Sequence, residues 1–399
     1  STMIINKRKI INLEYCVFSI LFGKKRIKAN NDVVFIPFFG RLGDMVMFLS
    51  TLQELKKLFV NKMRKKIVLG CRKEVWSLLQ SINAEQDLCF FELHRENLDI
   101  SINYFFDRVM AAQKIKPSCI LHIRENAVIE DLFIHAIPAD EKIIYRSFAI
   151  EHEGRASRFF SGNTYTKEMV PHDNMDQLTC YADMMRKLGL KSIKSRIPLL
   201  PEVGTINGII HGKYVCICPG ASVENKCWPS ERYARVLDYI TERLPYQIVF
   251  CGGKDDQYIS ACIIKKMKNS DIVLDMTGKT AIADWIALIR NAEFVLTNES
   301  GAVHIAASNQ VQAICIGEQK YSDKWLPYRP EEIGENDKIP IVVRGPRLNC
   351  EFCAARNFKR DAECIQCYQK NGVIRCVFEV KTEDVIQAVD EVIISLKQK

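Results

Sequence analysis

Several features that would assign this 399-residue sequence to a class at once are missing from it. No apolar run reaches the roughly 18–20 residues that a helix needs to cross a bilayer. No signal peptide is recognisable, so the 16 cysteines are expected as free thiols in a reducing cytoplasm rather than as disulfides. Gly278-Lys279-Thr280 lacks the upstream glycine of a phosphate-binding P-loop, because Val273 stands there. This difference excludes a P-loop ATPase.

A strong excess of charge of one sign is also missing. The net charge of +8 is mild for this length, and the basic residues are scattered apart from the N-terminus. A nucleic-acid-binding protein would concentrate them on one face. We therefore expect no nucleic-acid partner, and a surface that tolerates anionic substrates.

The basic and apolar N-terminal segment, residues 1–30, leaves two interpretations open. Residues 10–23 are largely apolar and have lysine and arginine on both sides. A helix that lies on the anionic inner face of the cytoplasmic membrane has this pattern. The other interpretation is a short helix packed on the first domain.

Runs of β-branched and aromatic residues alternate with segments of helical spacing. The expected strands lie at 32–38, 66–69, 118–123, 141–145, 213–218, 246–251, 272–274, 294–297 and 312–316. Strands that alternate with helices form parallel sheets through crossover connections. The sequence thus predicts an α/β fold of two Rossmann-like domains with a cleft between the carboxyl ends of their sheets.

The domain boundary is expected near residue 205, because Pro198, Pro201 and Gly204 punctuate a linker there. The predicted organisation is the N-terminal segment 1–30, a first domain at 31–204, a second domain at 205–340, and a Cys-rich segment with a C-terminal helix at 341–399.

The loop after the strand at 213–218 contains Gly220, Ser222 and Lys226. Glycine lets backbone approach a ligand closely, a serine hydroxyl donates to phosphate, and lysine adds a point charge. The alternative is a surface loop with a packed Trp228.

The next loop begins with Gly252 and Gly253 and continues with Asp255 and Asp256. Glycines at a strand end followed by carboxylates suit a nucleoside and its ribose hydroxyls. The same residues also make ordinary turns.

The third loop joins the strand at 294–297 to a helix. Ser300 is a good N-cap, and the helix start at Gly301 exposes N–H groups that favour a diphosphate. His304 lies about one turn further on the same face. A ligand contact and a structural role are both open for this histidine.

These loops together resemble glycosyltransferase family nine, the bacterial heptosyltransferases of lipopolysaccharide synthesis and their relatives. The resemblance rests on motifs in register over roughly residues 32–318: Gly43-Asp44, Cys218-Pro219-Gly220-Ala221-Ser222 with Lys226-Cys227-Trp228-Pro229, Phe250-Cys251-Gly252-Gly253, Thr277-Gly278-Lys279-Thr280, and Asn298-Glu299-Ser300-Gly301-Ala302-Val303-His304. It implies a GT-B fold and an inverting transfer from a nucleotide-sugar donor held by the second domain, with the acceptor on the first.

The resemblance also implies residue roles. Asp44 is expected as the catalytic base, although a helix-capping role is its alternative, and Lys226 as the cation on the leaving diphosphate. Asp255 or Asp256 is expected to hold the ribose. Glu299 stands where the family usually has aspartate. The expected nucleotide-sugar-binding residues are Gly43, Gly220, Ser222, Gly252, Gly253, Asp255, Asp256, Thr280, Glu299, Ser300, Gly301 and His304.

General physical chemistry fits these roles. A carboxylate removes the proton of the acceptor hydroxyl, while a lysine and a helix N-terminus stabilise the leaving phosphate. We therefore expect no metal in the catalytic step. The first-domain loops after residue 70, which should choose the acceptor, match the family poorly. The acceptor identity therefore does not carry over from the family, and a hydroxyl of a glycan, of a glycolipid or of a protein is expected.

A cysteine cluster near the C-terminus has the spacing of two metal-binding knuckles. Its members are Cys350, Cys353, Cys364, Cys367 and Cys376. Thiolates at this spacing suit tetrahedral zinc or iron. A reduced metal-free tail and a disulfide pair are the alternatives, and a structural metal would stabilise the second domain or an oligomer contact.

The expected function is an inverting transfer of a sugar, with heptose from ADP-heptose as the leading donor. A transferase that uses a GDP- or UDP-sugar is the nearest alternative. A metal-stabilised scaffold protein with a degenerate transferase fold is another, and the presence of Asp44 and Lys226 argues against it.

Overall fold

The computed structural model describes residues 30–124, 128–146, 164–171, 175–190, 196–206, 210, 212–221, 223–319, 325–326, 328, 338–346, 348 and 362–398. The N-terminal segment, Ser222, Cys350 and Cys353 lie outside these ranges. The predictions of a membrane-surface helix, of a serine phosphate contact and of the first cysteine pair therefore fall outside the described residues.

The chain divides into two units. The first comprises Ser1–Arg41 and Phe48–Lys194, and the second comprises Leu42–Met47 and Ser195–Lys399. The expected linker packs on the second unit, since Leu200 N donates to Ser308 O at 3.0 Å and Arg290 Nη2 donates to Val203 O at 3.1 Å. These contacts explain why the second unit resumes at Ser195, before the boundary that the sequence predicted near residue 205.

The first unit contains a six-stranded parallel sheet in the order β3-β2-β1-β4-β5-β6. Its strands are β1 (Asn30–Pro37), β2 (Lys66–Cys71), β3 (Leu88–Glu92), β4 (Pro117–Arg124), β5 (Glu141–Arg146) and β6 (Lys167–Met169). The central strand β1 is apolar on both faces, with Val34 and Phe35 fully buried, as expected of a strand inside a parallel sheet.

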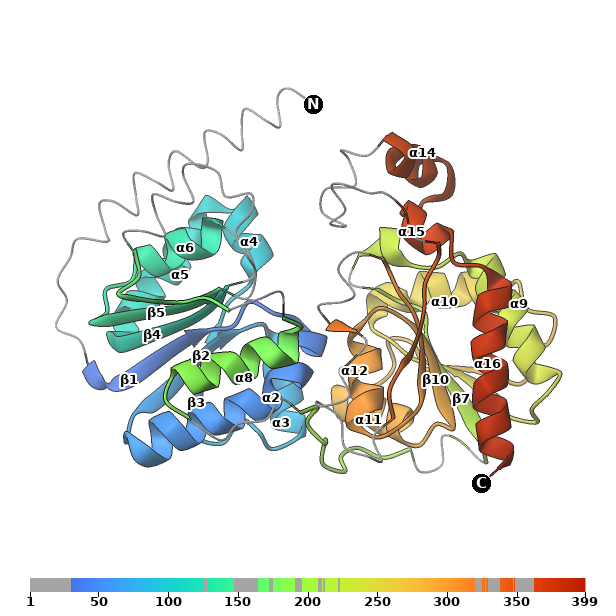
Figure 1. The fold of residues 1–399 in the computed structure, drawn as a ribbon, viewed down its shortest axis with the longest axis horizontal. Coiled ribbons are helices and arrows are strands. Elements are labelled where there is room, and N and C mark those ends of the chain that lie inside the picture. The colour runs from blue at the N-terminus through green and yellow to red at the C-terminus, as the bar shows by residue number, and fades with distance from the viewer. Residues whose placement is uncertain are drawn as a thin grey trace. The chain divides into compact units, whose positions relative to one another are not determined.

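Helices cover both faces of this sheet. They are α2 (Leu42–Lys56), the π-helical η1 (Lys57–Lys62), α3 (Lys73–Ser81), α4 (Arg95–Ile100), α5 (Ile102–Ile115), α6 (Val128–His135) and α8 (Gln177–Lys187). The first residues of α2, Leu42–Met47, belong to the second unit. Figure 1 shows α4, α5 and α6 on one face and α3 and α8 on the other. Leu98, Phe105 and Phe133 from the first group pack with Phe35 in one apolar core.

The second unit contains another six-stranded parallel sheet, in the order β12-β11-β10-β7-β8-β9. Its strands are β7 (Tyr214–Cys218), β8 (Gln247–Phe250), β9 (Val273–Asp275), β10 (Phe294–Asn298), β11 (Ala313–Ile316) and β12 (Ile341–Val343). Two sheets of this kind confirm the predicted α/β class with two Rossmann-like domains.

The helices of the second unit include the C-terminal end of the chain. They are η2 (Glu224–Lys226), α9 (Ser230–Thr241), η3 (Lys254–Asp256), α10 (Gln257–Ile264), α11 (Ile282–Arg290), α12 (Gly301–Ser308), α14 (Ala362–Asn371), α15 (Arg375–Phe378) and α16 (Thr382–Lys397). Helix α16 runs beside α9 (Figure 1). Val385, Val389 and Val392 of α16 join the core of this unit, so the C-terminal helix is an integral part of it.

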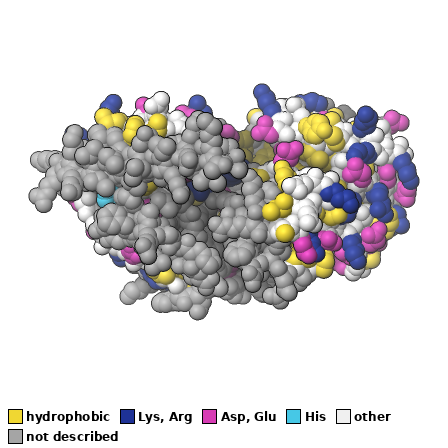
Figure 2. Space-filling model, turned by 90° about the horizontal axis from the view of Figure 1, so that it is seen from above, with side chains coloured by type: hydrophobic (Ala, Val, Ile, Leu, Met, Phe, Trp, Pro, Cys, Tyr) yellow, Lys and Arg dark blue, Asp and Glu magenta, His cyan; other side chains and the backbone are white. Residues whose placement is uncertain are grey.

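The surface agrees with the scattered charge of the sequence. Figure 2 shows lysine and arginine side chains interspersed with carboxylates over the described part of one face. Among the described helices, none is long and apolar enough to cross a membrane.

Candidate active site

The expected phosphate-binding loops meet at one edge of the second sheet. Strand β7 lies between β10 and β8, and β11 lies on the other side of β10. All these strands are parallel, so the loops that follow them emerge at the same carboxyl edge. Ligands of open α/β sheets bind at this edge.

Lys226 follows β7 and forms a buried ion pair. Its Nζ lies 2.8 Å from Glu318 Oε1, and the two side chains are 16% and 4% exposed. Glu318 follows β11, and the sequence analysis did not single it out. A carboxylate immediately after a predicted buried strand was the signal that could have found it.

Glu299 follows β10 and faces Glu318. Its Oε2 accepts a hydrogen bond from Glu318 N at 3.2 Å. Burial raises the pKa of Glu299 to about 7, and the Glu318 carboxylate adds to this effect while Lys226 and Arg344 oppose it. Glu299 therefore orients the loop after β11 from inside the protein.

Asn298 at the end of β10 ties two of the loops together. Its Nδ2 donates to Pro219 O, and its Oδ1 accepts from Trp228 N at 3.2 Å. The side chain is fully buried. Asn298 thus fixes the loop that carries Lys226, a role that the sequence analysis missed.

The start of α12 has the predicted capping geometry. Ser300 is the N-cap, and its Oγ accepts from Ala302 N at 3.3 Å. His304 is 6% exposed, and its Nδ1 lies 2.5 Å from Tyr328 Oη. Burial lowers the pKa of His304 to about 4, so this imidazole is neutral at pH 7.

Gly43 lies directly against the start of α12. Residues Leu42–Met47 belong to the second unit, and a Cβ on Gly43 would lie 2.9 Å from Gly301 Cα and 3.1 Å from His304 Cδ2. Two glycines are therefore needed where these backbones meet. Asp44 is half-buried and lies in the first turn of α2, where a carboxylate stabilises the helix N-terminus.

The two aspartates after β8 differ in environment. Asp256 Oδ2 accepts from Gly253 N at 2.8 Å, and a Cβ on Gly220 would lie 2.0 Å from Asp256 Oδ1. Burial raises the pKa of Asp256. Asp255 is exposed. Gly220 and Gly252 thus make room for a carboxylate of the protein itself, while Asp255 is the one directed to solvent.

Thr280 is half-buried and comes just before Ala281, the N-cap of α11. The turn that precedes it is tied to the loop after β8, because Gly278 N donates to Gly252 O at 2.9 Å. The structure thus brings most of the sequence-predicted residues to one sheet edge.

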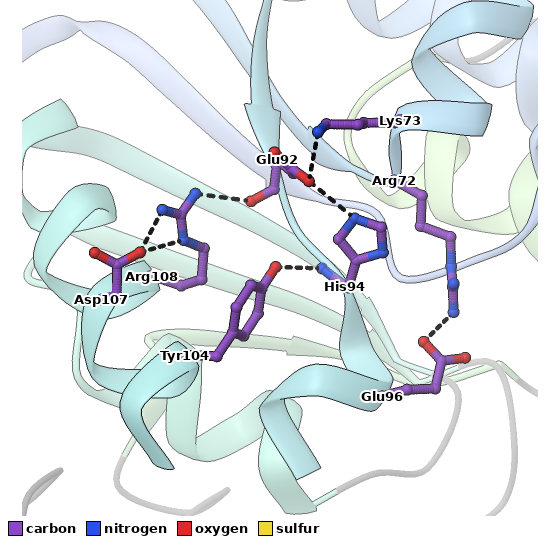
Figure 3. A network of polar contacts seen from close by, with 8 residues as sticks. All are labelled: Arg72, Lys73, Glu92, His94, Glu96, Tyr104, Asp107 and Arg108. Atoms are coloured by element: carbon purple, nitrogen blue, oxygen red, sulfur yellow. Dashed lines mark hydrogen bonds and ion pairs between the residues drawn. The ribbon is translucent and has the colours of Figure 1, made fainter. Parts of the chain in front are cut away.

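The corresponding edge of the first sheet carries a polar network that the sequence analysis missed (Figure 3). Glu92 at the end of β3 lies 3.2 Å from His94 Nε2 and 3.4 Å from Lys73 Nζ. Arg72 pairs with Glu96. This edge follows β2 and β3, where the family resemblance is weak.

The first unit contains a second, largely buried polar network. His122 Nδ1 lies 2.8 Å from Tyr165 Oη, and Tyr165 Oη donates to Asp131 Oδ1 at 2.6 Å. Glu130 Oε1 lies 3.0 Å from Arg95 Nε. The two charged partners in this last pair are largely buried, so each depends on the other for compensation.

The described cysteines of the C-terminal cluster pack in the second unit. Cys364 and Cys376 belong to its apolar core, and Cys367 is half-buried. Within the described ranges no three His, Cys, Asp or Glu residues are arranged to hold a metal ion. Ile374 N, close to Cys376, donates to Asn225 O at 2.9 Å, so this segment contacts the loop of Lys226.

Comparisons with known proteins agree with this arrangement. The sequence model described as glycosyltransferase family 9 (heptosyltransferase) matches residues 176–335. Lipopolysaccharide heptosyltransferase 3 of Escherichia coli K12 is 23% identical over 283 residues, which are 67% of this chain and 70% of that protein. Lipooligosaccharide heptosyltransferase 2 of Haemophilus influenzae is 30% identical over 94 residues, 23% of this chain and 27% of that protein.

Solved structures share the fold. A glycosyltransferase family 9 protein from Veillonella parvula superposes with a TM-score of 0.65 at 17% identity, over 93% of this chain and 100% of the other. The E. coli ADP-heptose lipopolysaccharide heptosyltransferase II gives a TM-score of 0.58 at 15% identity, over 92% and 99%. The predicted GT-B fold is confirmed.

Proposed function

Because the chain belongs to glycosyltransferase family 9, we propose that it transfers heptose from ADP-heptose to a hydroxyl of a glycan, glycolipid or protein, with inversion at the transferred carbon. The family makes it a glycosyltransferase. The donor is proposed from the names of its relatives, which are heptosyltransferases.

One observation supports the donor site most strongly. Lys226 and the N-terminus of α12 emerge from the neighbouring strands β7 and β10. An ammonium beside a helix N-terminus suits a diphosphate. Sugar transfer builds negative charge on the leaving diphosphate, and preorganised positive groups stabilise it. We therefore propose that no metal takes part in the transfer step.

The remaining roles follow from exposure and chemistry. Asp44 is the proposed base that removes the proton of the acceptor hydroxyl. Asp255 is the proposed ribose ligand, because the Asp256 carboxylate is bound to the Gly253 N–H. The neutral His304 imidazole offers a hydrogen bond to the donor without adding charge.

Calorimetry with ADP, GDP, UDP and ADP-heptose tests the donor site. Lys226→Ala should weaken binding of ADP-heptose by about 1.5–3 kcal/mol, the scale of a lost charge-assisted hydrogen bond. Lys213→Ala is the matched control, since Lys213 pairs with Glu293 at 3.2 Å at the opposite end of the sheet. Failure of the protein to bind any of the four ligands would contradict the proposal and favour the scaffold alternative.

A structural zinc or iron ion is a separate proposal for the cysteine cluster. Cys364, Cys367 and Cys376 do not form an ion site by themselves among the described residues. An ion would therefore need Cys350 or Cys353 as further thiolate ligands. Its role would be to hold the C-terminal segment, with no part in the transfer.

A further inference from the structure

The ammonium that the proposed function assigns to the donor diphosphate already has a partner. Lys226 Nζ lies 2.8 Å from Glu318 Oε1, and Glu318 Oε2 is buried without a hydrogen-bond partner among the described residues. The partner carboxylate is thus only partly satisfied by the protein.

The backbone holds Glu318 firmly in this place. Gly317 N donates to Val343 O at 3.0 Å, and Glu318 N donates to Glu299 Oε2 at 3.2 Å. Two carboxyl groups therefore lie at the end of β11 next to one lysine. Carboxylates are unusual beside a diphosphate site, because buried carboxylates repel an anionic ligand.

Breaking a buried ion pair leaves an uncompensated charge and is costly. If Lys226 moved to the diphosphate and left Glu318 ionised, that cost in free energy would weaken donor binding. The cost disappears when a proton from solvent takes the place of the ammonium.

We propose that Glu318 is a positioning residue that holds Lys226 at the donor site, and that the Glu299–Glu318 carboxyl pair takes up one proton from solvent when the donor diphosphate draws the ammonium away. The proton returns to solvent when the nucleoside diphosphate leaves and Lys226 pairs with Glu318 again. This inference rests on the proposed function.

The charged surroundings of the pair support proton uptake near neutral pH. The pKa of Glu299 is raised to about 7, because burial and then the Glu318 carboxylate raise it more than Lys226 and Arg344 lower it. Moving Lys226 towards the phosphates weakens one lowering influence and brings new negative charge. Cys315 of β11, another titratable group that interacts with Glu299, is a buried thiol whose pKa is raised well above its ordinary value, so it stays neutral.

Calorimetry of ADP-heptose binding at pH 7 in buffers of different ionisation enthalpy measures the proton directly. Both phosphates of this ligand are linked on two sides, so the ligand itself does not titrate near neutral pH. Wild type should take up a fraction of one proton, because Glu299, with a pKa of about 7, already carries part of that proton at pH 7. Glu318→Gln and Glu299→Gln should each reduce this uptake at least severalfold.

A kinetic readout separates positioning from a merely structural role. Glu318→Gln should lower kcat/KM for the donor about tenfold, with a smaller change in kcat, because the amide positions the ammonium less firmly before the donor binds and mimics the neutral carboxyl after it has bound. Glu318→Asp should recover part of the loss. Glu293→Gln, which removes the carboxylate of the Lys213 pair, is the control and should change neither proton uptake nor kcat/KM.

The outcomes are distinct. ADP-heptose binding by wild type without proton uptake would overturn the inference and leave the proposed function intact. Uptake that persists in both glutamine variants would assign the proton to another group, such as His304, and would also overturn it. No binding of ADP-heptose or of any nucleoside diphosphate would remove the proposed function, and the inference with it.

Discussion

Lys226 Nζ and Glu318 Oε1 lie 2.8 Å apart in a largely buried ion pair. The two residues follow different strands, β7 and β11, and come together only because β10 lies between these strands in the sheet. The lysine is thereby oriented before any donor arrives. Preorganised charge of this kind is what stabilises a leaving group without reorganisation during the reaction.

The close approach of Gly220 to Asp256 predicts that a side chain at position 220 destabilises the protein. A Cβ on Gly220 would lie 2.0 Å from Asp256 Oδ1, whereas one on Gly253 would lie 3.8 Å from Asp256 Oδ2. Gly220→Ala should lower the free energy of unfolding by about 1–3 kcal/mol, measured by urea denaturation. The double variant with Asp256→Ala should recover part of this loss, and Gly253→Ala should cost less. Equal costs for the two glycines would refute the explanation.

Burial of His304 predicts a pH dependence of stability. Its pKa is lowered to about 4 from an ordinary 6.5, so the unfolded chain binds the proton first as the pH falls. Stability from this residue is complete above pH 6.5 and is lost as the pH falls from 6.5 towards 4. The stability of His304→Gln should fall less over this window, by roughly 3 kcal/mol at most. Parallel urea-denaturation profiles for wild type and variant would contradict the prediction.

The cysteine cluster predicts metal content that depends on residues outside the described ranges. The full chain, purified without chelator, should carry zinc or iron by elemental analysis, and Cys350→Ser with Cys353→Ser should remove it. Chelation should lower Tm, because a structural ion contributes to folding. Cys89→Ser, at an exposed thiol, is the control. Purified wild-type protein without zinc or iron would contradict this prediction and favour the metal-free alternative.

The positions of most strands along the chain and the donor loops could be predicted from the sequence because their signals are local. Buried strands are continuous apolar runs, and each is followed by a loop of glycine, serine and charged residues. Ser300 as a helix cap needs only its own strand–turn–helix context, and the structure confirms it.

Long-range pairing could not be predicted in the same way. Lys226 and Glu318 are 92 residues apart in the sequence, and Asn298 and Trp228 are 70 apart. Which strand lies beside which is a property of the whole sheet. The network around Glu92 and His94 was missed because the sequence analysis expected no strand at Leu88–Glu92, and mixed charges also occur on ordinary solvated surfaces.

Asp44→Asn tests the account of transfer most directly. Release of ADP from ADP-heptose is measured with membranes of a heptose-deficient Gram-negative strain, which carry glycan, glycolipid and protein hydroxyls. Wild type should release ADP well above a control without membranes. Asp44→Asn should release it about 10²–10⁴-fold more slowly while ADP-heptose binding stays within a few fold, and Glu74→Gln, at another first-turn carboxylate, should match wild type. Equal rates for Asp44→Asn and wild type, or no ADP release above the control, would contradict the account.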